Sequence, residues 1–241
     1  TGTNHIDLKY CDENNIKIIS LRNEKKIIKK ISSTAELAFL LSLLMLRNIP
    51  EANKSVFRGE WDYEKFIGRQ LNEVTIGVIG YGRLGKIITK YFKTFGSKII
   101  IYDPYLNIND NKIKQTNNIQ DLLKTADIIT IHIHADKKNT NFIDSNKLIQ
   151  MKKNVIIINT SRGEVIDEKA LVQFLKKNKL AKIATDVLLN EQTNRNKSLL
   201  LKYSFKSNQV FITPHIGGMT NKAQEIAYNH IVNLLANEIC I

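Results

Sequence analysis

Three residues with the functional groups needed for catalysis, Arg162, Glu191 and His215, each follow an apolar segment typical of a buried strand. A guanidinium group can hold a carboxylate through two parallel hydrogen bonds. A histidine beside a carboxylate favours its charged form and could donate a proton to an oxygen atom. Taken alone, Arg162 is equally well explained as a surface arginine capped by Asp167. Catalysis therefore requires a fold that brings the three side chains together.

A glycine-rich loop with the pattern G-x-G-x-x-G occupies residues 80–85, between a predicted strand and a predicted helix. In such loops Gly80 would permit the tight turn and Gly82 would let the backbone approach a pyrophosphate, while Gly85 would let the helix pack close to the strand. The unpaired N–H groups and positive dipole at the helix N-terminus favour phosphate groups. The loop predicts dinucleotide binding.

An acidic residue stands where the second strand of such a unit ends. Asp103 lies about 20 residues beyond the loop, where a carboxylate binds the hydroxyl groups of the adenosine ribose. A carboxylate there repels a 2′-phosphate, and Pro104 and Tyr105 supply no compensating positive charge. We therefore predict NAD rather than NADP as the cofactor.

From Glu73 onward, six short apolar segments alternate with helical patterns, which is typical of a parallel sheet with helices on both faces. The predicted strands are Thr75–Ile79, Lys98–Tyr102, Ile128–His132, Val155–Asn159, Lys182–Asp186 and Val210–Thr213. The predicted helices are Leu84–Phe95, Asp121–Lys124, Ser145–Met151 and Glu168–Asn178, and Asn190–Ser198 is a predicted polar surface loop. We expect an α/β fold with a doubly wound parallel Rossmann sheet, whose strand ends would gather the catalytic candidates in one crevice facing the glycine-rich loop.

The residues before Glu73 form a different unit. Thr1–Arg22 contain a helix-like start and a predicted strand at Ile16–Ser20. A long helix is predicted at Thr34–Asn48, with Thr34 as its cap and Pro50 just past its end, and a final helix is predicted at Asn221–Ala236. Because the chain starts without methionine in what reads as the middle of a loop, we interpret it as part of a longer protein.

Together these motifs resemble the D-isomer-specific 2-hydroxyacid dehydrogenase family, with phosphoglycerate dehydrogenase among its members. The resemblance runs nearly end to end, over Thr1–Asp7, Thr34–Leu37, Gly59–Trp61, the glycine-rich loop through Asp103, Ser161–Asp167, Asp186, Glu191 and Pro214–Gly218. It implies an NAD-dependent oxidoreductase that interconverts 2-hydroxy acids and 2-oxo acids. It also implies three parts: residues 1–32 as a remnant of a flavodoxin-like substrate domain, residues 33–215 as the NAD-binding domain, and residues 216–241 as a helix returning towards the substrate domain.

The resemblance also implies roles for individual residues. Arg162 would bind the carboxylate and carbonyl oxygen of the substrate, His215 would be the acid/base, and Glu191 would pair with His215. Thr1 and Gly2 resemble the backbone loop that receives the substrate carboxylate. The implied cofactor-binding residues are Gly80, Gly82, Arg83, Leu84, Gly85, Asp103, Thr160, Asp186, His215 and Gly217, with Asp186 contacting the nicotinamide carboxamide.

The chain departs from many relatives in two places. His132-Ile133-His134 stands where they read His-Val-Pro, so a histidine replaces a proline beside the expected cofactor cleft. We favour a local structural role for His134 over contact with substrate or cofactor. The segment Leu21–Ile31 is longer than in most relatives. Relatives are usually homodimers paired through the cofactor domain and the long helix, so a homodimer is the expected assembly.

The composition bears on the other function classes. The net charge is +13, but the lysines are scattered and no zinc-finger spacing, RNP-type aromatic motif or basic heptad segment accompanies them, so we expect no nucleic-acid partner. The closest candidate for a membrane span, Ala35–Leu46, carries Glu36 and falls short of the roughly 20 residues needed, so we expect no membrane partner. Cys11 and Cys240 lack metal-ligand spacing, which favours free thiols in the cytoplasm and no metal.

Two other functions compete with the enzyme. One is a non-catalytic NAD(H)-binding regulator of the corepressor type, which shares the fold and retains similar residues. The other is a nucleic-acid binder driven by the positive charge, which would show a strongly salt-dependent affinity for DNA. The enzyme is favoured because Arg162, Glu191 and His215 are all present.

Overall fold

The computed structural model describes residues 6–108, 110 and 113–239. The chain divides into two compact units. One unit is Ala35–Gly217, and the other combines Thr1–Thr34 with Gly218–Ile241.

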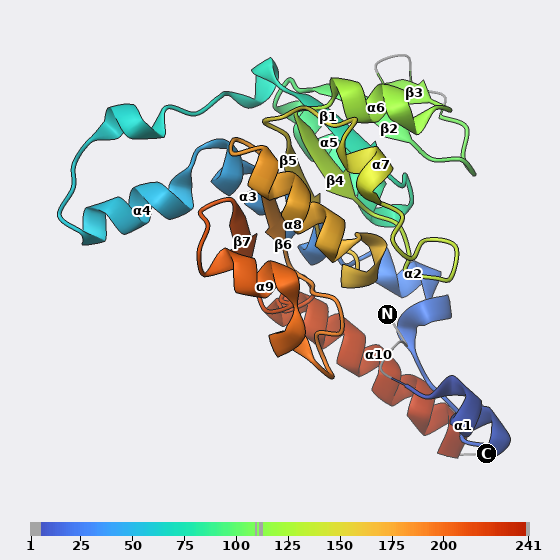
Figure 1. The fold of residues 1–241 in the computed structure, drawn as a ribbon. Coiled ribbons are helices and arrows are strands. Elements are labelled where there is room, and N and C mark those ends of the chain that lie inside the picture. Colours follow the sequence, from blue (N-terminus) through green and yellow to red (C-terminus); the bar gives the residue numbers. More distant parts are fainter. Residues whose placement is uncertain (1–5, 109, 111–112, 240–241) are drawn as a thin grey trace. The chain divides into compact units, whose positions relative to one another are not determined.

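The larger unit is built on one parallel sheet of seven strands in the order β3-β2-β1-β4-β5-β6-β7, seen in Figure 1. The strands are β1 Thr75–Ile79, β2 Lys98–Tyr102, β3 Lys114–Thr116, β4 Ile128–Ile131, β5 Ile156–Asn159, β6 Lys182–Thr185 and β7 Val210–Ile212. The order runs outward in both directions from β1 and β4, which is the doubly wound arrangement of a Rossmann domain. The predicted fold class is confirmed.

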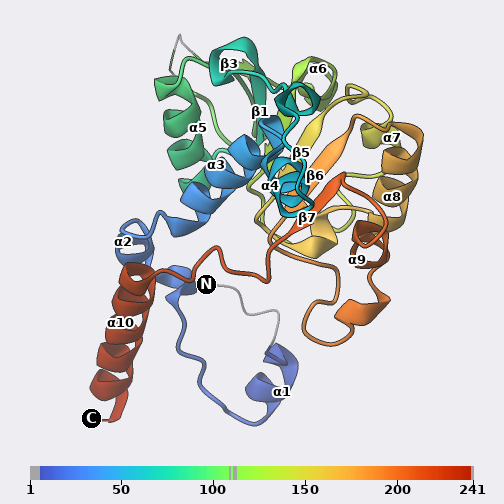
Figure 2. The same cartoon turned by 90° about the vertical axis from the view of Figure 1, so that its left-hand side faces the viewer.

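Helices cover both faces of the sheet because the strands are apolar on both sides. On one face, buried side chains of α6, α7, α8 and α9 pack on the strands; on the other, those of α3 and α5 do so. Figure 2 shows α3 and α5 on one side of the sheet and α7 and α8 on the other. The bounds are α3 Ser33–Leu46, α5 Arg83–Thr94, α6 Ile119–Thr125, α7 Ser145–Leu148, α8 Glu168–Lys177 and α9 Leu199–Ser204.

Six strands were predicted, and all six are confirmed to within a residue at each end. The seventh, β3, was missed because its sequence Lys114-Gln115-Thr116 is polar, and it pairs with β2 at the edge of the sheet. An edge strand is half covered, so it needs no apolar run of the kind that marks a central strand. Short helix α9 was also missed, and the predicted polar loop before it contains the 3₁₀ turn Arg195–Lys197.

The start of the long helix α3 was predicted wrongly. The helix begins at Ser33, so Thr34 lies within its first turn and does not cap it. The helix ends at Leu46, and Asn48 then adopts a left-handed conformation with φ of 55°. Pro50 lies in the first turn of the next helix, α4 (Ile49–Phe57). Backbone N–H groups in a first turn have no partner within the helix, so the N–H that proline lacks costs no hydrogen bond there. Pro50 therefore starts a helix as well as following one.

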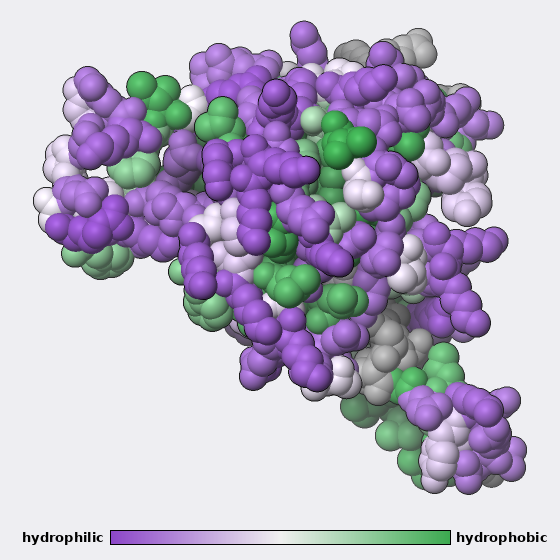
Figure 3. Space-filling model, in the orientation of Figure 1, coloured by the Kyte–Doolittle hydropathy of each residue, from purple (hydrophilic) through white to green (hydrophobic). Residues whose placement is uncertain are grey.

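α4 and the segment after it, residues 58–70, project from the rest of this unit (Figure 1). That segment contains the 3₁₀ turn Tyr63–Phe66, and a further 3₁₀ turn, Leu71–Glu73, leads into β1. In Figure 3 the projection carries apolar groups among hydrophilic ones. We call residues 49–70 the arm.

The smaller unit is helical in its described residues. It contains α1 Leu8–Glu13, a 3₁₀ turn at Leu21–Asn23, α2 Lys25–Ile28 and α10 Asn221–Ile239, which is longer than predicted. Helices α2 and α10 are in contact, and His230 Nε2 lies 2.8 Å from Glu24 Oε2 between them. No described helix of the chain combines the length and apolarity needed to cross a membrane.

The strand predicted at Ile16–Ser20 is wrong. These residues carry neither helix nor strand, and the described part of this unit offers no neighbouring strand to pair with them. The β-branched isoleucines favour extended backbone, but a strand also needs hydrogen bonds from a partner. Ser20 instead caps the following 3₁₀ turn, its hydroxyl oxygen accepting from the Arg22 N–H at 3.4 Å.

Candidate active site

The glycine-rich loop connects β1 to α5 and crosses the end of β4. Gly80 has φ of 90°, a left-handed conformation that favours glycine, and a Cβ at this position would lie 2.7 Å from the carbonyl oxygen of His132. A Cβ on Gly85 would lie 2.1 Å from the carbonyl oxygen of Gly80, so the helix starts in direct contact with the turn. A Cβ on Gly82, the residue that precedes α5, would have no other atom of the described residues within 4 Å apart from its chain neighbours. The chain thus leaves room for a ligand at the N-terminus of a twelve-residue helix.

Asp103 fastens the end of β2 to this loop. Its side chain is buried, and Oδ2 accepts a hydrogen bond from the Tyr81 N–H at 2.7 Å while Oδ1 accepts one from the Tyr105 N–H at 2.9 Å. Each carboxylate oxygen can accept further hydrogen bonds. The carboxylate therefore lies against the loop, where a ribose would need it.

The remaining predicted cofactor residues lie on the same side of the sheet or at its carboxyl edge. Burial lowers the pKa of Arg83, in the first turn of α5. Leu84 packs against the core beneath the loop. Thr160 follows β5 and is buried, with no hydrogen-bond partner for its hydroxyl among the described residues. A buried hydroxyl without a partner is costly, so it is a candidate contact for a bound group.

Arg162 lies in a tight loop at the end of β5. Its backbone is extended, with φ of −148° and ψ of 149°, and its Nη1 donates to the carbonyl oxygen of Ser161 at 2.6 Å. The side chain of Asn159 accepts from Ser161 and donates to the Arg162 carbonyl oxygen, which closes the loop. The guanidinium group is partly buried.

Glu191 and His215 are hydrogen-bonded to each other, through Oε1 and Nδ1. Glu191 comes from the loop after β6, and its other oxygen, Oε2, accepts from the Leu188 N–H at 3.1 Å. His215 comes from the turn after β7 and has φ of 56°, which is uncommon for a residue with a side chain. The His215 side chain is 43% exposed, so its ring remains accessible.

Asp186, at the end of β6, holds the turn that carries His215. The Asp186 side chain is buried, and Oδ1 accepts from the Thr213 hydroxyl at 2.5 Å and from the Ile216 N–H at 2.8 Å. Oδ2 accepts from the Gly217 N–H at 2.7 Å. Successive N–H groups that converge on one carboxylate fix the backbone on which His215 stands. The predicted contact of Asp186 with a nicotinamide carboxamide stays a prediction.

The loops after β5, β6 and β7 thus meet at the carboxyl end of three neighbouring strands. The Asp186 N–H donates to the Asn159 carbonyl oxygen at 2.9 Å, and the Thr213 N–H donates to the Thr185 carbonyl oxygen at 3.0 Å. Because β1, β4 and β5 are also neighbours, the glycine-rich loop lies at the same edge. The loops of Arg162, Glu191 and His215 therefore follow three neighbouring strands at one edge of the sheet, and the shared catalytic role of the three side chains stays a prediction.

The two histidines after β4 differ sharply. His132 Nε2 lies 2.8 Å from the Thr130 hydroxyl, its Nδ1 is buried without a partner in the described chain, and burial lowers its pKa to about 4. His134 is exposed, and its carbonyl oxygen accepts from Asn139 Nδ2 at 2.9 Å. The local structural role of His134 stays a prediction.

Two predicted substrate-binding residues, Thr1 and Gly2, lie outside the described residues. Sequence reasoning left out Asn159 and Thr213, although both hold the loops of the catalytic candidates. An asparagine at a strand end two residues before a serine amide is typical of an Asx turn, so the signal was available for Asn159. Within the described residues, no His, Cys, Asp and Glu side chains gather in a group that could hold a metal ion.

Residues 39–217 match the family described as "D-isomer specific 2-hydroxyacid dehydrogenase, NAD binding domain". The chain is 38% identical over 229 residues to D-3-phosphoglycerate dehydrogenase of Methanocaldococcus jannaschii, an alignment that covers 94% of this chain and 42% of that protein. The chain spans about two fifths to one half of the length of the curated relatives that it matches.

Solved structures give the same result. D-2-hydroxyisocaproate dehydrogenase matches with a TM-score of 0.83 and 30% identity, over 99% of this chain and 74% of that one. D-lactate dehydrogenase from Aquifex aeolicus, solved as a complex with NAD and lactic acid, matches with a TM-score of 0.79 and 29% identity, also over 99% and 74%.

Proposed function

The chain belongs to the D-isomer specific 2-hydroxyacid dehydrogenase family, and we propose that its protein is an NAD-dependent oxidoreductase that interconverts a 2-hydroxy acid and a 2-oxo acid. The observation that supports the proposal most strongly is the His215–Glu191 hydrogen bond beside the loop of Arg162. An acid/base and a group that binds carboxylates are what this reaction requires of the protein.

NAD is the proposed cofactor, and the residues at the glycine-rich loop fit it. Gly82 leaves room at the N-terminus of α5 for a pyrophosphate, and Asp103 lies where the adenosine ribose would come. The hydroxyl of Thr160, buried without a described partner, offers a further contact. When bound, the cofactor supplies or accepts the hydride.

The residues of the chain would bind the substrate and move the proton. Arg162 would pair with the substrate carboxylate and polarise the carbonyl oxygen. Since Glu191 is bonded to Nδ1 of His215, Nε2 is the ring atom left for the substrate. In reduction Nε2 would donate its proton to the carbonyl oxygen as the hydride reaches C2, and in oxidation it would take the proton back. Glu191 would stabilise the charged ring and fix its orientation.

The domain arrangement belongs to the proposal as well. Residues 33–215 would be the NAD-binding domain, residues 1–32 part of a substrate domain, and residues 216–241 a helix that returns towards it. Thr1 and Gly2 would receive the substrate carboxylate. In the cytoplasm Cys11 would remain the free thiol that it is here.

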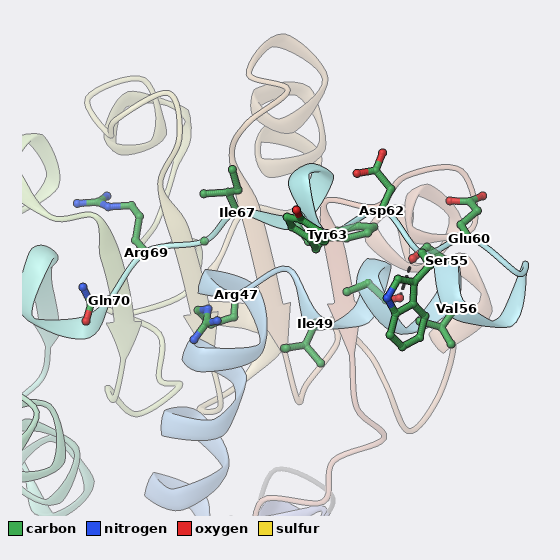
Figure 4. A pocket seen from close by; sticks show the side chains of 14 residues that line it. Arg47, Ile49, Ser55, Val56, Glu60, Asp62, Tyr63, Ile67, Arg69 and Gln70 are labelled. Carbon is green, nitrogen blue, oxygen red and sulfur yellow. Dashed lines mark hydrogen bonds between the residues drawn. The ribbon is translucent and has the colours of Figure 1, made fainter.

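A homodimer is proposed because the arm and α3 carry large apolar side chains without cover. Trp61 is 86% exposed and Phe57 84%, and Leu40 on α3 is half exposed. Figure 4 shows Ile49 and Tyr63 among the side chains that line a groove of about 650 Å³ along the arm, between α4 and the segment that follows it. Exposed apolar side chains gathered in this way mark an interaction surface. A second copy of the chain would bring an equal apolar surface to it.

The test is an assay of NADH oxidation by the intact protein with glyoxylate, pyruvate, hydroxypyruvate and 3-phosphohydroxypyruvate. Oxidation with at least one of these 2-oxo acids supports the dehydrogenase. Tight binding of NADH without oxidation by any of them would support a corepressor-type regulator instead. Binding of DNA that weakens steeply with salt would point to the nucleic-acid alternative.

A further inference from the structure

We propose that Asn159 is a positioning residue that sets the orientation of Arg162, an inference that rests on the substrate-binding role proposed above for Arg162. Asn159 is the last residue of β5, and only 2% of it is exposed. A buried amide side chain needs hydrogen-bond partners, because an unpaired one costs free energy. The hydrogen-bond partners of the Asn159 side chain therefore identify the segment whose position it fixes.

Among the described residues, the hydrogen-bond partners of the Asn159 side chain belong to the loop of Arg162. Nδ2 donates to the Arg162 carbonyl oxygen at 2.9 Å. Oδ1 accepts from the Ser161 N–H at 3.1 Å and from the Ser161 hydroxyl at 2.9 Å. These bonds hold the Thr160–Ser161 and Arg162–Gly163 peptide groups, one before and one after the Ser161–Arg162 segment. They therefore restrain the backbone from which the guanidinium stem leaves.

The backbone of Asn159 is itself fixed by the sheet. It pairs in register with Ile131 on β4 and with Thr185 on β6. Its carbonyl oxygen accepts from the Asp186 N–H at 2.9 Å and from the Thr185 hydroxyl at 3.2 Å. Because Asp186 holds the turn of His215, the loops of Arg162 and His215 are anchored on neighbouring strand ends that are bonded to each other.

The far side of the Arg162 loop is closed by a backbone contact. A Cβ on Gly163 would lie 2.1 Å from the carbonyl carbon of Leu188, so the loop presses against the segment that leads to Glu191. Leu188 also donates its N–H to Glu191. The Arg162 loop is thus held between the Asn159 amide and the backbone that carries the partner of His215.

The experiment is a double-mutant cycle in the intact protein, with Asn159→Ala, Arg162→Ala and the double variant. Ser161→Ala is the matched control, since it removes one hydrogen bond to the Asn159 oxygen and keeps the two that involve peptide groups. Asn159→Asp keeps the acceptor and loses the donor. For each variant we would measure kcat and KM for the 2-oxo acid, the Kd of NADH by fluorescence, and the melting temperature.

If Asn159 acts through Arg162, Asn159→Ala raises KM for the 2-oxo acid by about ten-fold or more, with the Kd of NADH within about two-fold of wild type. Adding Asn159→Ala to Arg162→Ala then costs less than about two-fold, because the orienting effect has nothing left to orient. Ser161→Ala changes KM by less than about two-fold, and Asn159→Asp falls between the two.

An equal loss from Asn159→Ala in both backgrounds, or a loss of NADH affinity as large as the rise in KM, would overturn the proposal, since either is the mark of general damage to the fold. A second readout does not depend on turnover. The rate at which phenylglyoxal modifies Arg162, followed by peptide mass spectrometry, should differ from wild type by at least about three-fold in Asn159→Ala. In Ser161→Ala this rate should remain near that of the wild type.

The two readouts separate this proposal from the proposed function. If the wild-type protein reduces no 2-oxo acid but the reactivity of Arg162 changes as described, the positioning role stands and the function is wrong. If the protein is active and neither the coupling nor the reactivity of Arg162 changes, the positioning role is wrong and the function stands.

Discussion

His215 Nδ1 is hydrogen-bonded to Glu191 Oε1, and the second oxygen of the same carboxylate accepts from the Leu188 N–H at 3.1 Å. The carboxylate is therefore fixed by its own loop before it meets the ring. A histidine held in this way presents Nε2 in one orientation, as an acid/base must.

The first prediction concerns His215 itself. Replacement by asparagine removes the proton donor and keeps a polar side chain of similar reach. Turnover in the intact protein should fall by about 100-fold to 10,000-fold, with the affinity for NADH nearly unchanged. Steady-state kinetics and NADH fluorescence titration measure the two quantities. Equal losses of turnover and NADH affinity would show that His215 holds the structure and does not move the proton.

The second prediction concerns the choice of cofactor. Asp103→Ala removes the carboxylate that lies against the glycine-rich loop, together with its bonds to Tyr81 and Tyr105. We expect the Kd of NADH to rise by about ten-fold and the preference over NADPH to shrink, because the repulsion of a 2′-phosphate is gone. Parallel titrations with NADH and NADPH check this. An unchanged ratio of the two affinities would argue against the ribose assignment.

The third prediction concerns stability in mild acid. Burial lowers the pKa of His132 from 6.5 to about 4, so between these values the unfolded chain binds a proton that the folded chain does not. The free energy of unfolding should therefore fall as the pH drops from 6.5 towards 4, and this contribution should level off below that. In His132→Gln the fall should be smaller by on the order of 2 kcal/mol.

Urea denaturation at pH values on either side of that window measures the effect. His134→Gln is the matched control, since this second histidine is exposed and lies two positions away. Identical pH dependence in His132→Gln and the wild type would mean that His132 is not kept neutral in the folded protein.

The fourth prediction concerns the arm. Trp61→Glu places a charge on the proposed apolar contact surface. We expect this charge to raise the dissociation constant of the dimer by at least about 100-fold, which favours the monomer. Phe205→Glu is the control. Phe205 is a similarly exposed aromatic residue, at 80%, but it lies at the C-terminal end of α9 and outside the arm. Analytical ultracentrifugation distinguishes the outcomes. A Trp61→Glu protein that dimerises as tightly as the wild type would exclude the arm from the interface.

The central strands could be predicted because their apolar residues are packed on both faces. Ile128–Ile131 and Ile156–Asn159, for example, are buried along their whole length. The glycine-rich loop could be predicted for a different reason, since its backbone contacts leave few alternatives at Gly80 and Gly85. Local sequence was therefore enough to predict most of the sheet and the conformation of the glycine-rich loop.

The remaining features depend on partners that are distant in sequence. β3 forms a strand because it pairs with β2. Ile16–Ser20 do not form a strand, because the described part of their unit contains no strand with which they could pair. The Asp186 carboxylate accepts hydrogen bonds from the turn that carries His215, about 30 positions further along the chain. No local sequence pattern indicates these bonds. The start of α3 at Ser33 was obscured because three successive hydroxyl residues, Ser32, Ser33 and Thr34, precede the same apolar run.

The most direct test of the account is a crystal structure of the intact protein with NADH and oxamate, a 2-oxo acid analogue that is not reduced. We predict the oxamate carboxylate paired with the Arg162 guanidinium group, its carbonyl oxygen within hydrogen-bonding distance of His215 Nε2, and the pyrophosphate at the glycine-rich loop. Oxamate bound away from both Arg162 and His215, or a dinucleotide that leaves the glycine-rich loop empty, would contradict it.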